Sequence, residues 1–281
     1  MLSTRILTAV VALAAVLAAL FLFPPLYFAV LVLLVVAAAA HEWARLARLT
    51  PAARVLFVLV VVVAGLALIF TQPARSTRGW SPAVVLGVCG VATAFWLLVA
   101  TPWVVQRWPM RPGPALVITG WIVLLGAFVG LTELEARSPW LVLAAMAIVW
   151  IADTAAYFTG RAFGRRKLAP QVSPGKTWEG VYGALVAVAL YALALAALGS
   201  RAGYAGPVDA ASIAVWLAFA VAVAALSVVG DLFESWLKRE AGVKDSGSLL
   251  PGHGGVLDRI DALLAAMPPL ALAAWLALPT S

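Results

Sequence analysis

The chain has 281 residues, of which 64% are hydrophobic and only 11% are charged, and its mean hydropathy is +1.05. Soluble domains carry about 25% charged residues, so this composition excludes a soluble globular protein. A formal net charge of +7 could indicate a nucleic-acid partner, but in a membrane protein the placement of Lys and Arg decides what the surplus means.

Nine apolar runs come close to the roughly 20 residues that a helix needs to cross the hydrocarbon core of a bilayer. The first has no clear cleavage site and is followed at once by another apolar run, so we interpret it as a span and not as a signal peptide. The second is short unless its helix extends past His41. The sequence therefore predicts an all-α integral membrane protein with about nine transmembrane helices. In chain order the runs are 6–23, 25–40, 54–71, 82–105, 115–132, 139–159, 178–199, 210–230 and 260–279.

The distribution of basic residues predicts how these helices are oriented. If the N-terminus is cytoplasmic, 15 of the 19 Lys and Arg fall in cytoplasmic segments, and only Arg75, Arg78, Arg137 and Arg201 fall outside. Cytoplasmic loops carry an excess of Lys and Arg. We therefore expect a cytoplasmic N-terminus and an outside C-terminus, and the basic surplus requires no nucleic acid.

The polar residues divide the chain into two parts. We expect N-terminal transmembrane helices over 1–135 and a catalytic transmembrane region over 136–281, with charged cytoplasmic loops at 160–177 and 231–259. Residues 230–261 hold ten of the 31 charged residues of the chain. Charge is expensive beside lipid, so this density predicts chemistry more than solvation.

Four polar residues of this stretch stand at i, i+3, i+4 and i+7, namely Asp231, Glu234, Ser235 and Lys238. They share one face if the helix of the eighth run continues beyond residue 230. Such a face can bind a divalent cation through its carboxylates and phosphate oxygens through Lys238 and Arg239. A solvated helix end with Glu–Lys pairs explains the same pattern equally well.

A glycine-rich loop with one proline precedes the last apolar run. Its backbone can approach a ligand closely, and its amides, beside His253, Gly254 and Gly255, suit phosphate oxygens. Asp258 and Asp261 follow one turn apart, near the positive N-terminal end of a helix. Helix capping explains one of these aspartates but not both, so we predict a functional site here.

A third polar group lies further upstream. Asp153 falls inside an apolar run, where a carboxylate costs a few kcal/mol unless it meets a cation, a partner or water. A helix–helix hydrogen bond is the alternative. Ser173 and Lys176 then stand in a turn before the next helix, whose first amides can bind an anion. A Ser-Pro turn with a capping Thr177 is also common.

Other reactive residues are scarce. The chain has one cysteine, Cys89, and two histidines, His41 and His253, which excludes a thiolate metal site and a serine triad. We interpret His41 and Glu42 as an interfacial anchor with a supporting polar role. Carboxylates, basic side chains and glycine-loop amides on one face of a membrane describe a site for Mg²⁺ and phosphates.

At this point the residues resemble a known family. The run S-W-L-K-R-E-A-G-V-K-D-S-G-S-L-L-P-G-H-G-G-V-L-D-R-I-D, which ends at Asp261, resembles the signature of the phosphatidate cytidylyltransferases, or CDP-diacylglycerol synthases. D-T-A-A-Y-F-T-G-R-A-F-G and S-P-G-K-T-W-E-G resemble two further family stretches in the expected order. The N-terminal half matches only in hydropathy and in the pair His41 and Glu42. Gly175 departs from the pattern, because a second Lys is expected there.

The resemblance implies a polytopic enzyme that forms CDP-diacylglycerol and pyrophosphate from CTP and phosphatidic acid, with Asp231 and Asp258 binding the catalytic metal. We expect Mg²⁺, multi-pass insertion in the inner membrane and an active site facing the cytoplasm. A second, monovalent cation and a homodimer are left open. The expected catalytic residues are Asp231, Lys238, Arg239, Asp258 and Arg259, and the expected substrate-binding residues are Asp153, Ser173, Lys176, Lys244, Asp245, His253, Gly254, Gly255 and Asp261.

Two other functions are considered. A CTP-dependent polyprenol or dolichol-type lipid kinase would transfer the γ-phosphate to a lipid alcohol and would need a base. A secondary transporter would use Asp153 and Asp231 as ion ligands, but transporters show paired, broken spans in two halves. Here the polar residues gather in the C-terminal half.

Overall fold

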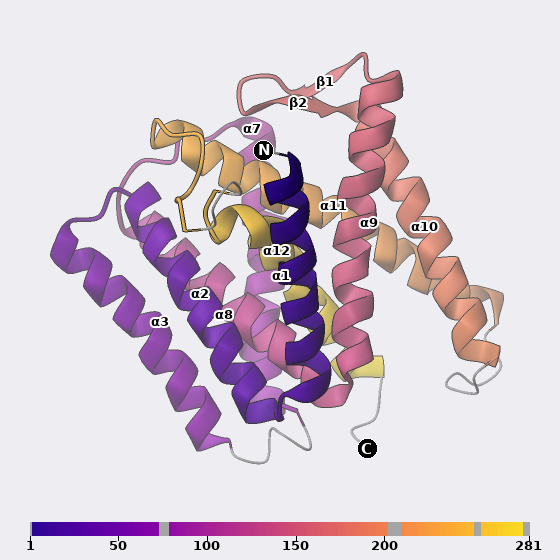
Figure 1. Cartoon of the computed structure of the whole chain (residues 1–281), viewed down its shortest axis with the longest axis horizontal. Coiled ribbons are helices and arrows are strands. Elements are labelled where there is room, and N and C mark those ends of the chain that lie inside the picture. Colours follow the sequence, from indigo (N-terminus) through magenta and orange to yellow (C-terminus); the bar gives the residue numbers. More distant parts are fainter. Residues whose placement is uncertain (1, 73–78, 202–208, 250–253, 278–281) are drawn as a thin grey trace.

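The computed structural model describes residues 2–72, 79–201, 209–249 and 254–277, which form a bundle of helices with one short hairpin (Figure 1). Two antiparallel strands, β1 (Lys167–Ala169) and β2 (Ser173–Thr177), stand between α9 and α10. The helical elements are α1 (Leu2–Leu22), α2 (Pro25–Leu46), α3 (Pro51–Thr71), α5 (Pro82–Val84), η1 (Val85–Cys89), α6 (Gly90–Phe95), η2 (Trp96–Ala100), α7 (Thr101–Gln106), α8 (Pro114–Arg137), α9 (Pro139–Phe163), α10 (Trp178–Arg201), α11 (Ala210–Glu240) and α12 (Leu257–Ala277).

Every one of the nine predicted runs falls on a helix, and α5 to α7 form one continuous rod. Within the described ranges, eight helices are long and apolar enough to cross a membrane. Helix α1 covers the remaining run, which is the first in the chain, and its apolar segment is Leu13–Leu22. Large apolar side chains such as Phe70 and Leu98 are exposed on the outside of the bundle, as contact with lipid requires. The all-α multi-pass prediction is confirmed.

The polar connections differ from the predicted loops in two places. Helix α11 continues to Glu240, so the segment 231–259 is not one loop: its first ten residues are helical, and α12 begins at Leu257. The segment 160–177 begins with the end of α9 and then holds the hairpin. Helix α11 persists because Phe233 and Leu237 pack into the core at 1% exposure each. The second helix does extend past His41.

Helices α8 and α12 lie at the centre of the bundle. Glycines on α8 permit their close approach, since a Cβ atom at Gly130 would lie 2.9 Å from the backbone of Met267. In a regular helix the carbonyl of Leu264 would accept the N–H of residue 268, but Pro268 has no N–H group. The indole Nε1 of Trp96, on the π-helical turn η2, donates to that carbonyl at 2.9 Å. This contact fixes α12, whose first turn carries Asp258.

Contacts between the connections define the two ends of the bundle. At one end Arg48 donates to the carbonyl of Glu240 at 2.7 Å, and Trp236 donates to the carbonyl of Trp108 at 3.0 Å. The hairpin lies at the same end, because Arg239 donates to the carbonyl of Val172. We call this the hairpin end; α1 begins there in Figure 1.

The opposite end, which we call the distal end, holds the other set of connections. Trp80 donates its backbone N–H to Glu133 at 2.7 Å, and the rings of Phe21 and Trp140 lie 4.8 Å apart. Helix α12 ends on this side (Figure 1). The connections that carry most of the basic residues are thus gathered at the hairpin end.

Candidate active site

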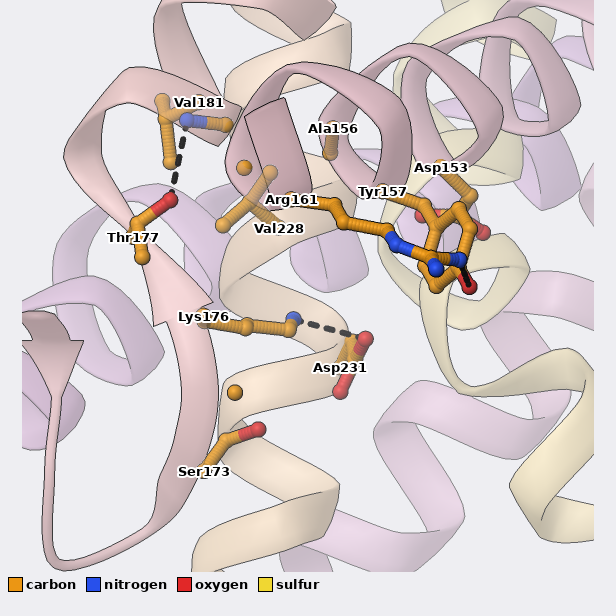
Figure 2. Close-up of a pocket in the computed structure, with 13 residues that line it drawn as sticks. Asp153, Ala156, Tyr157, Arg161, Ser173, Lys176, Thr177, Val181, Val228 and Asp231 are labelled. Carbon is orange, nitrogen blue, oxygen red and sulfur yellow. Dashed lines mark hydrogen bonds and ion pairs between the residues drawn. The ribbon is translucent and has the colours of Figure 1, made fainter. Parts of the chain in front are cut away.

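A cavity of about 420 Å³ lies at the hairpin end, between α9, β2, α10 and α11 (Figure 2). Four of the predicted site residues line it: Asp153, Ser173, Lys176 and Asp231. The fold thus brings together motifs that are about 80 residues apart in the sequence. The full lining consists of Asp153, Ala156, Tyr157, Gly160, Arg161, Ser173, Gly175, Lys176, Thr177, Gly180, Val181, Val228 and Asp231.

Lys176 and Asp231 point toward each other in this cavity (Figure 2). The Nζ atom of Lys176 lies 2.6 Å from Oδ2 of Asp231, and these side chains are 25% and 29% exposed. Asp153 lines the same cavity, and Asp261 of α12 is close enough to both aspartates for their charges to repel. The cavity and its surroundings therefore bring two basic side chains, Lys176 and Arg161, together with three carboxyl groups.

The local sequence around β2 holds Lys176 against the cavity. The Oγ1 atom of Thr177 accepts the N–H of Gly180 at 3.2 Å, which caps α10. Glu179, in the first turn of α10, accepts the backbone N–H groups of Arg165 and Arg166 at 3.0 and 3.2 Å. These bonds tie the hairpin to the start of α10 and so fix the strand that carries Lys176.

Helices α9 and α10 form the opposite wall and pack closely through small residues. A Cβ atom at Gly180 would lie 2.8 Å from the carbonyl oxygen of Ala156, and one at Gly183 would collide with the side chain of Thr159. Small residues allow helix backbones to approach in a membrane. This wall therefore has little room to widen, and the spacing of Asp153 from Lys176 is set by backbone contact.

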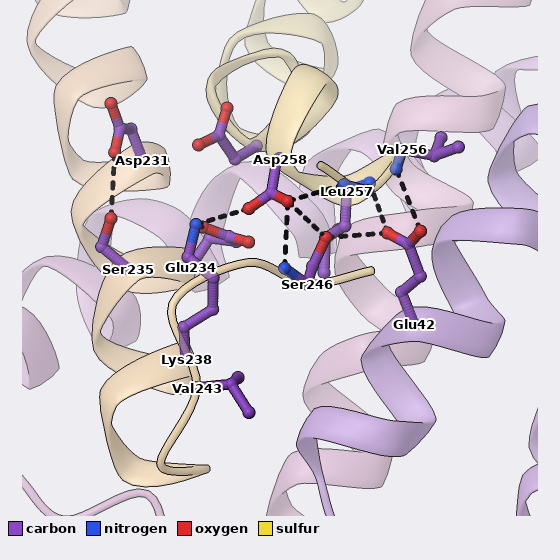
Figure 3. A network of polar contacts seen from close by, with 12 residues as sticks. Glu42, Asp231, Glu234, Ser235, Lys238, Val243, Ser246, Val256, Leu257 and Asp258 are labelled. Carbon is purple, nitrogen blue, oxygen red and sulfur yellow. Dashed lines mark hydrogen bonds and ion pairs between the residues drawn. The ribbon is translucent and has the colours of Figure 1, made fainter. Parts of the chain in front are cut away.

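A second polar group lies beside the cavity, between α2, α11 and α12 (Figure 3). We call it the Asp258 cluster; its members are Glu42, Glu234, Lys238, Ser246 and Asp258. The Nζ atom of Lys238 lies 2.5 Å from Oδ1 of Asp258 and 2.6 Å from Oε2 of Glu234. Oδ2 of Asp258 accepts the backbone N–H groups of Ser246 and Gly255 at 2.9 and 2.8 Å.

In this cluster the carboxyl groups outnumber the basic side chains. The side chains of Glu234 and Asp258 are 2% and 5% exposed, and Glu42 is 4% exposed. Oε1 of Glu234 has no hydrogen-bond partner in the part of the chain that the structure describes. A buried carboxylate is costly unless it is paired. Lys238, the basic member of the cluster, contacts two of its three buried carboxylates, Glu234 and Asp258.

The predicted face of α11 is helical, and it divides between these two groups. Asp231 lines the cavity and accepts a hydrogen bond from Ser235 at 3.3 Å. Lys238, two turns later, is engaged by Asp258 instead of lining the cavity. Asp261, on α12, lies where α11 comes closest, because a Cβ atom at Gly230 would be 2.7 Å from its carbonyl oxygen.

Other predicted site residues lie away from the cavity lining. Arg239 donates to the carbonyls of Val172 and Val243, so it joins the hairpin to α11. Lys244, Asp245 and Arg259 are exposed. A catalytic role for Arg239 and Arg259, and a substrate-binding role for Lys244 and Asp245, stay predictions.

The glycine loop contacts Asp258. Gly254 has a φ of +80°, and a Cβ atom there would lie 2.7 Å from Oδ2 of Asp258. The amide of Gly255, which we expected to suit a phosphate, donates to the same oxygen. His253 lies outside the described residues.

Four members of the site are not among the residues that the sequence predicts for it. Ser246 gives no signal. The sequence predicts an interfacial anchor with a supporting polar role for Glu42, and a carboxylate near the C-terminal end of a helix opposes the macrodipole, which is a signal for a partner elsewhere. Tyr157 and Arg161 follow Asp153 at i+4 and i+8, and this spacing could have placed them on one face.

The oxygen-rich donor set is of the kind that Mg²⁺ binds. No group of three or more His, Cys, Asp or Glu side chains within the described ranges converges tightly enough to hold a metal by itself. Asp231 accepts one contact on each oxygen, from Ser235 and from Lys176, and a carboxylate has about four lone-pair sites. Asp231 can therefore take a further ligand.

Comparison with known proteins agrees with this arrangement. The model of the cytidylyltransferase family matches residues 3–277. The chain is 41% identical over 298 residues to a phosphatidate cytidylyltransferase of Pseudomonas aeruginosa, covering 99% of this chain and 98% of the relative. It is 39% identical over 283 residues to one of Haemophilus influenzae, covering 95% and 96%. Because the similarity extends through the N-terminal half as well as the signature, the chain belongs to the cytidylyltransferase family.

Proposed function

We propose that the protein is a phosphatidate cytidylyltransferase, which converts CTP and phosphatidic acid into CDP-diacylglycerol and pyrophosphate. The observation that supports this most directly is the cavity in which Lys176, Asp153 and Asp231 meet apolar residues of the spans. Its polar residues suit phosphates and a cation. Its apolar residues, among them Val181 and Val228, suit a substrate whose tails stay in the bilayer.

The reaction makes modest demands on side chains, and the cavity meets them. The nucleophile is an oxygen of the phosphatidate phosphate, which is already anionic and needs no base. It attacks the α-phosphorus of CTP, the bond to the bridging oxygen of the β-phosphate breaks, and pyrophosphate leaves. Phosphoryl-type transfer depends mainly on positioning and charge neutralisation. Lys176 supplies positive charge inside the cavity, and Arg161 supplies it at the lining of α9.

We propose Asp231 and Asp258 as the residues that hold Mg²⁺. The carboxyl groups at the hairpin end support this assignment, because they offer more acceptor oxygens than Lys176 and Lys238 contact. Bound Mg²⁺ would neutralise triphosphate charge and polarise the α-phosphate. Asp153 and Asp261 add further carboxyl groups near Asp231.

We propose that the hairpin end faces the cytoplasm. The connections there carry most of the Lys and Arg, and CTP is a cytoplasmic nucleotide. A reporter fused after Ser281 should then appear outside the cytoplasm, and one inserted near Gln171 should appear inside. The same side for both reporters would contradict this topology.

The fate of the CTP phosphorus atoms tests the proposal. With purified protein, phosphatidate and Mg²⁺, CTP labelled at the α-phosphorus should leave label in the chloroform-soluble lipid. CTP labelled at the γ-phosphorus should yield only water-soluble pyrophosphate. Lipid label from the γ-position would identify a kinase and contradict the proposal.

A further inference from the structure

We infer that Glu42 is a positioning residue: its carboxylate binds Ser246, Val256 and Leu257 and thereby keeps Asp258 in place. The inference rests on the proposed function for what Asp258 does, but its geometry is independent of that function. It gives the N-terminal part of the chain, 1–135, a specific task in the site.

The contacts of Glu42 are long-range and use both oxygens. Oε1 accepts the backbone N–H of Val256 at 3.0 Å, and Oε2 accepts the backbone N–H of Leu257 at 2.8 Å. Oε2 also accepts the hydroxyl of Ser246 at 2.8 Å. Leu257 is the first residue of α12, and Asp258 is the second. A side chain of α2 therefore binds the amides immediately before Asp258.

Ser246 connects Glu42 to Asp258 directly (Figure 3). Its Oγ atom lies 2.8 Å from Oε2 of Glu42 and 3.0 Å from Oδ2 of Asp258. A hydroxyl has one hydrogen to donate, so the two carboxylates share it. The backbone N–H of Ser246 donates to Asp258 as well, at 2.9 Å. A displacement of Glu42 is therefore transmitted to Asp258 through one residue.

The backbone of two glycines packs closely against the carboxylate of Glu42. A Cβ atom at Gly247 or Gly255 would collide with the carboxylate oxygens of Glu42. Trp43, the next residue, is 1% exposed and donates its indole N–H to the carbonyl of Leu116 at 3.0 Å, which fixes the rotation of α2. The negative charge of Glu42 interacts unfavourably with the dipole at the C-terminal end of α2 and favourably with the dipole at the N-terminus of α12.

Glu42→Gln is the sharpest test, because it preserves the volume and replaces one acceptor oxygen by a donor that faces N–H groups. Groups that support a metal ligand change metal affinity or activity by about 10- to 100-fold. We expect Glu42→Gln to lower kcat within that range and to raise the Mg²⁺ concentration for half-maximal rate, while KM for phosphatidate changes little. Glu133→Gln, a buried glutamate at the distal end, is the matched control and should leave all three values unchanged.

Two further readouts do not depend on turnover. Mn²⁺ binding to the purified protein, measured by electron paramagnetic resonance, should be weaker in Glu42→Gln than in the wild type and the Glu133→Gln control. Hydrogen exchange of the amides of Val256 and Leu257 should be faster. If Glu42→Gln does not fold, Ser246→Ala, which leaves the two backbone contacts of Glu42, should shift the Mg²⁺ requirement in the same direction.

The outcomes separate the two proposals. A wild type that forms no CDP-diacylglycerol contradicts the proposed function, and the Mn²⁺ affinities then decide the inference alone. Equal Mn²⁺ affinity in wild type and Glu42→Gln, including none in either, overturns it. So does a variant that only reduces the amount of folded protein and keeps the wild-type kcat and Mg²⁺ requirement.

Discussion

Glutamates are buried at both ends of the bundle, but the basic side chains that contact them differ between the two ends. At the distal end Glu133 is fully buried, and Arg137, one turn later, contacts it at 2.7 Å with 5% exposure. At the hairpin end six carboxylates gather around two ion-paired lysines, Lys176 and Lys238. These carboxylates are Glu42, Asp153, Asp231, Glu234, Asp258 and Asp261.

The difference separates a structural use of buried charge from a functional one. A buried carboxylate that meets its own cation holds a connection in place, as Glu133 does when it accepts the N–H of Trp80. An excess of buried carboxylates costs stability unless a cation joins them or some of them are protonated. The hairpin end keeps this excess beside a cavity, which is what a site for Mg²⁺ and phosphates requires.

The largest predicted effect is on metal use at the hairpin end. Asp258→Asn removes a charged ligand, so activity should fall by about 10²-fold or more, the scale for losing one group that stabilises transition-state charge. EDTA should stop the wild type, and added Mg²⁺ should restore it. The assay is formation of CDP-diacylglycerol per inserted protein. Substantial activity in Asp258→Asn, or no response to EDTA, would sink the metal assignment.

A change at the distal end should affect stability instead. Glu133→Ala removes the ion pair with Arg137 and the acceptor for the N–H of Trp80. Breaking a buried pair costs about 3–5 kcal/mol, so we expect a lower Tm in a thermal-unfolding assay. The protein that is folded should keep wild-type kcat. A lower kcat with an unchanged Tm would mean that the comparison between the two ends is wrong.

A smaller loss of stability is expected when the hydrogen bond from Trp96 to the carbonyl of Leu264, in α12, is removed. Trp96→Phe keeps an aromatic ring but removes part of the buried indole and the donor to the carbonyl of Leu264, which Pro268 leaves without an N–H partner. An unsatisfied buried acceptor costs about 1–3 kcal/mol. Thermal unfolding measures the loss, and Trp140→Phe, whose side chain is exposed, is the control. Equal Tm values in the two variants would contradict this role for Trp96.

The smallest effect is predicted at Gly175, where the family resemblance leads us to expect a second Lys. A Cβ atom at Gly175 would meet nothing within 4 Å, so Gly175→Lys should change stability by no more than about 0.5 kcal/mol. Gly180→Ala is the matched contrast, because its Cβ atom would lie 2.8 Å from the carbonyl of Ala156, and overpacking costs about 1–3 kcal/mol. If both variants unfold at the same temperature, the close packing of α9 and α10 is not what fixes this wall.

The sequence predicts the spans well because hydropathy and length alone decide which segments cross a bilayer. It also predicts the face of α11 that carries Asp231 and Lys238, since helical spacing is a local property. It does not predict the hairpin, because β2 contains Pro174 and Gly175, which strands usually avoid. Nor does it place the end of α11, where tertiary packing of Phe233 extends the helix into a charged stretch.

The pairing within the Asp258 cluster could not be read from the chain. Glu42 and Ser246 are 204 residues apart, and their contact depends on which apolar helices pack together. The helices are apolar on most faces, so hydropathy does not order them. The sequence likewise assigns Lys238 to phosphate, whereas the structure pairs it with Asp258 and Glu234.

The central claim is that the carboxylate excess at the hairpin end is an active site for cytidylyl transfer. The most direct measurement is Mg²⁺-dependent incorporation of label from α-labelled CTP into lipid by purified wild type, Asp231→Asn and Glu133→Gln. We predict labelled lipid from wild type and Glu133→Gln, and background from Asp231→Asn, although all three insert and fold. Equal labelling by Asp231→Asn and the wild type would contradict the claim.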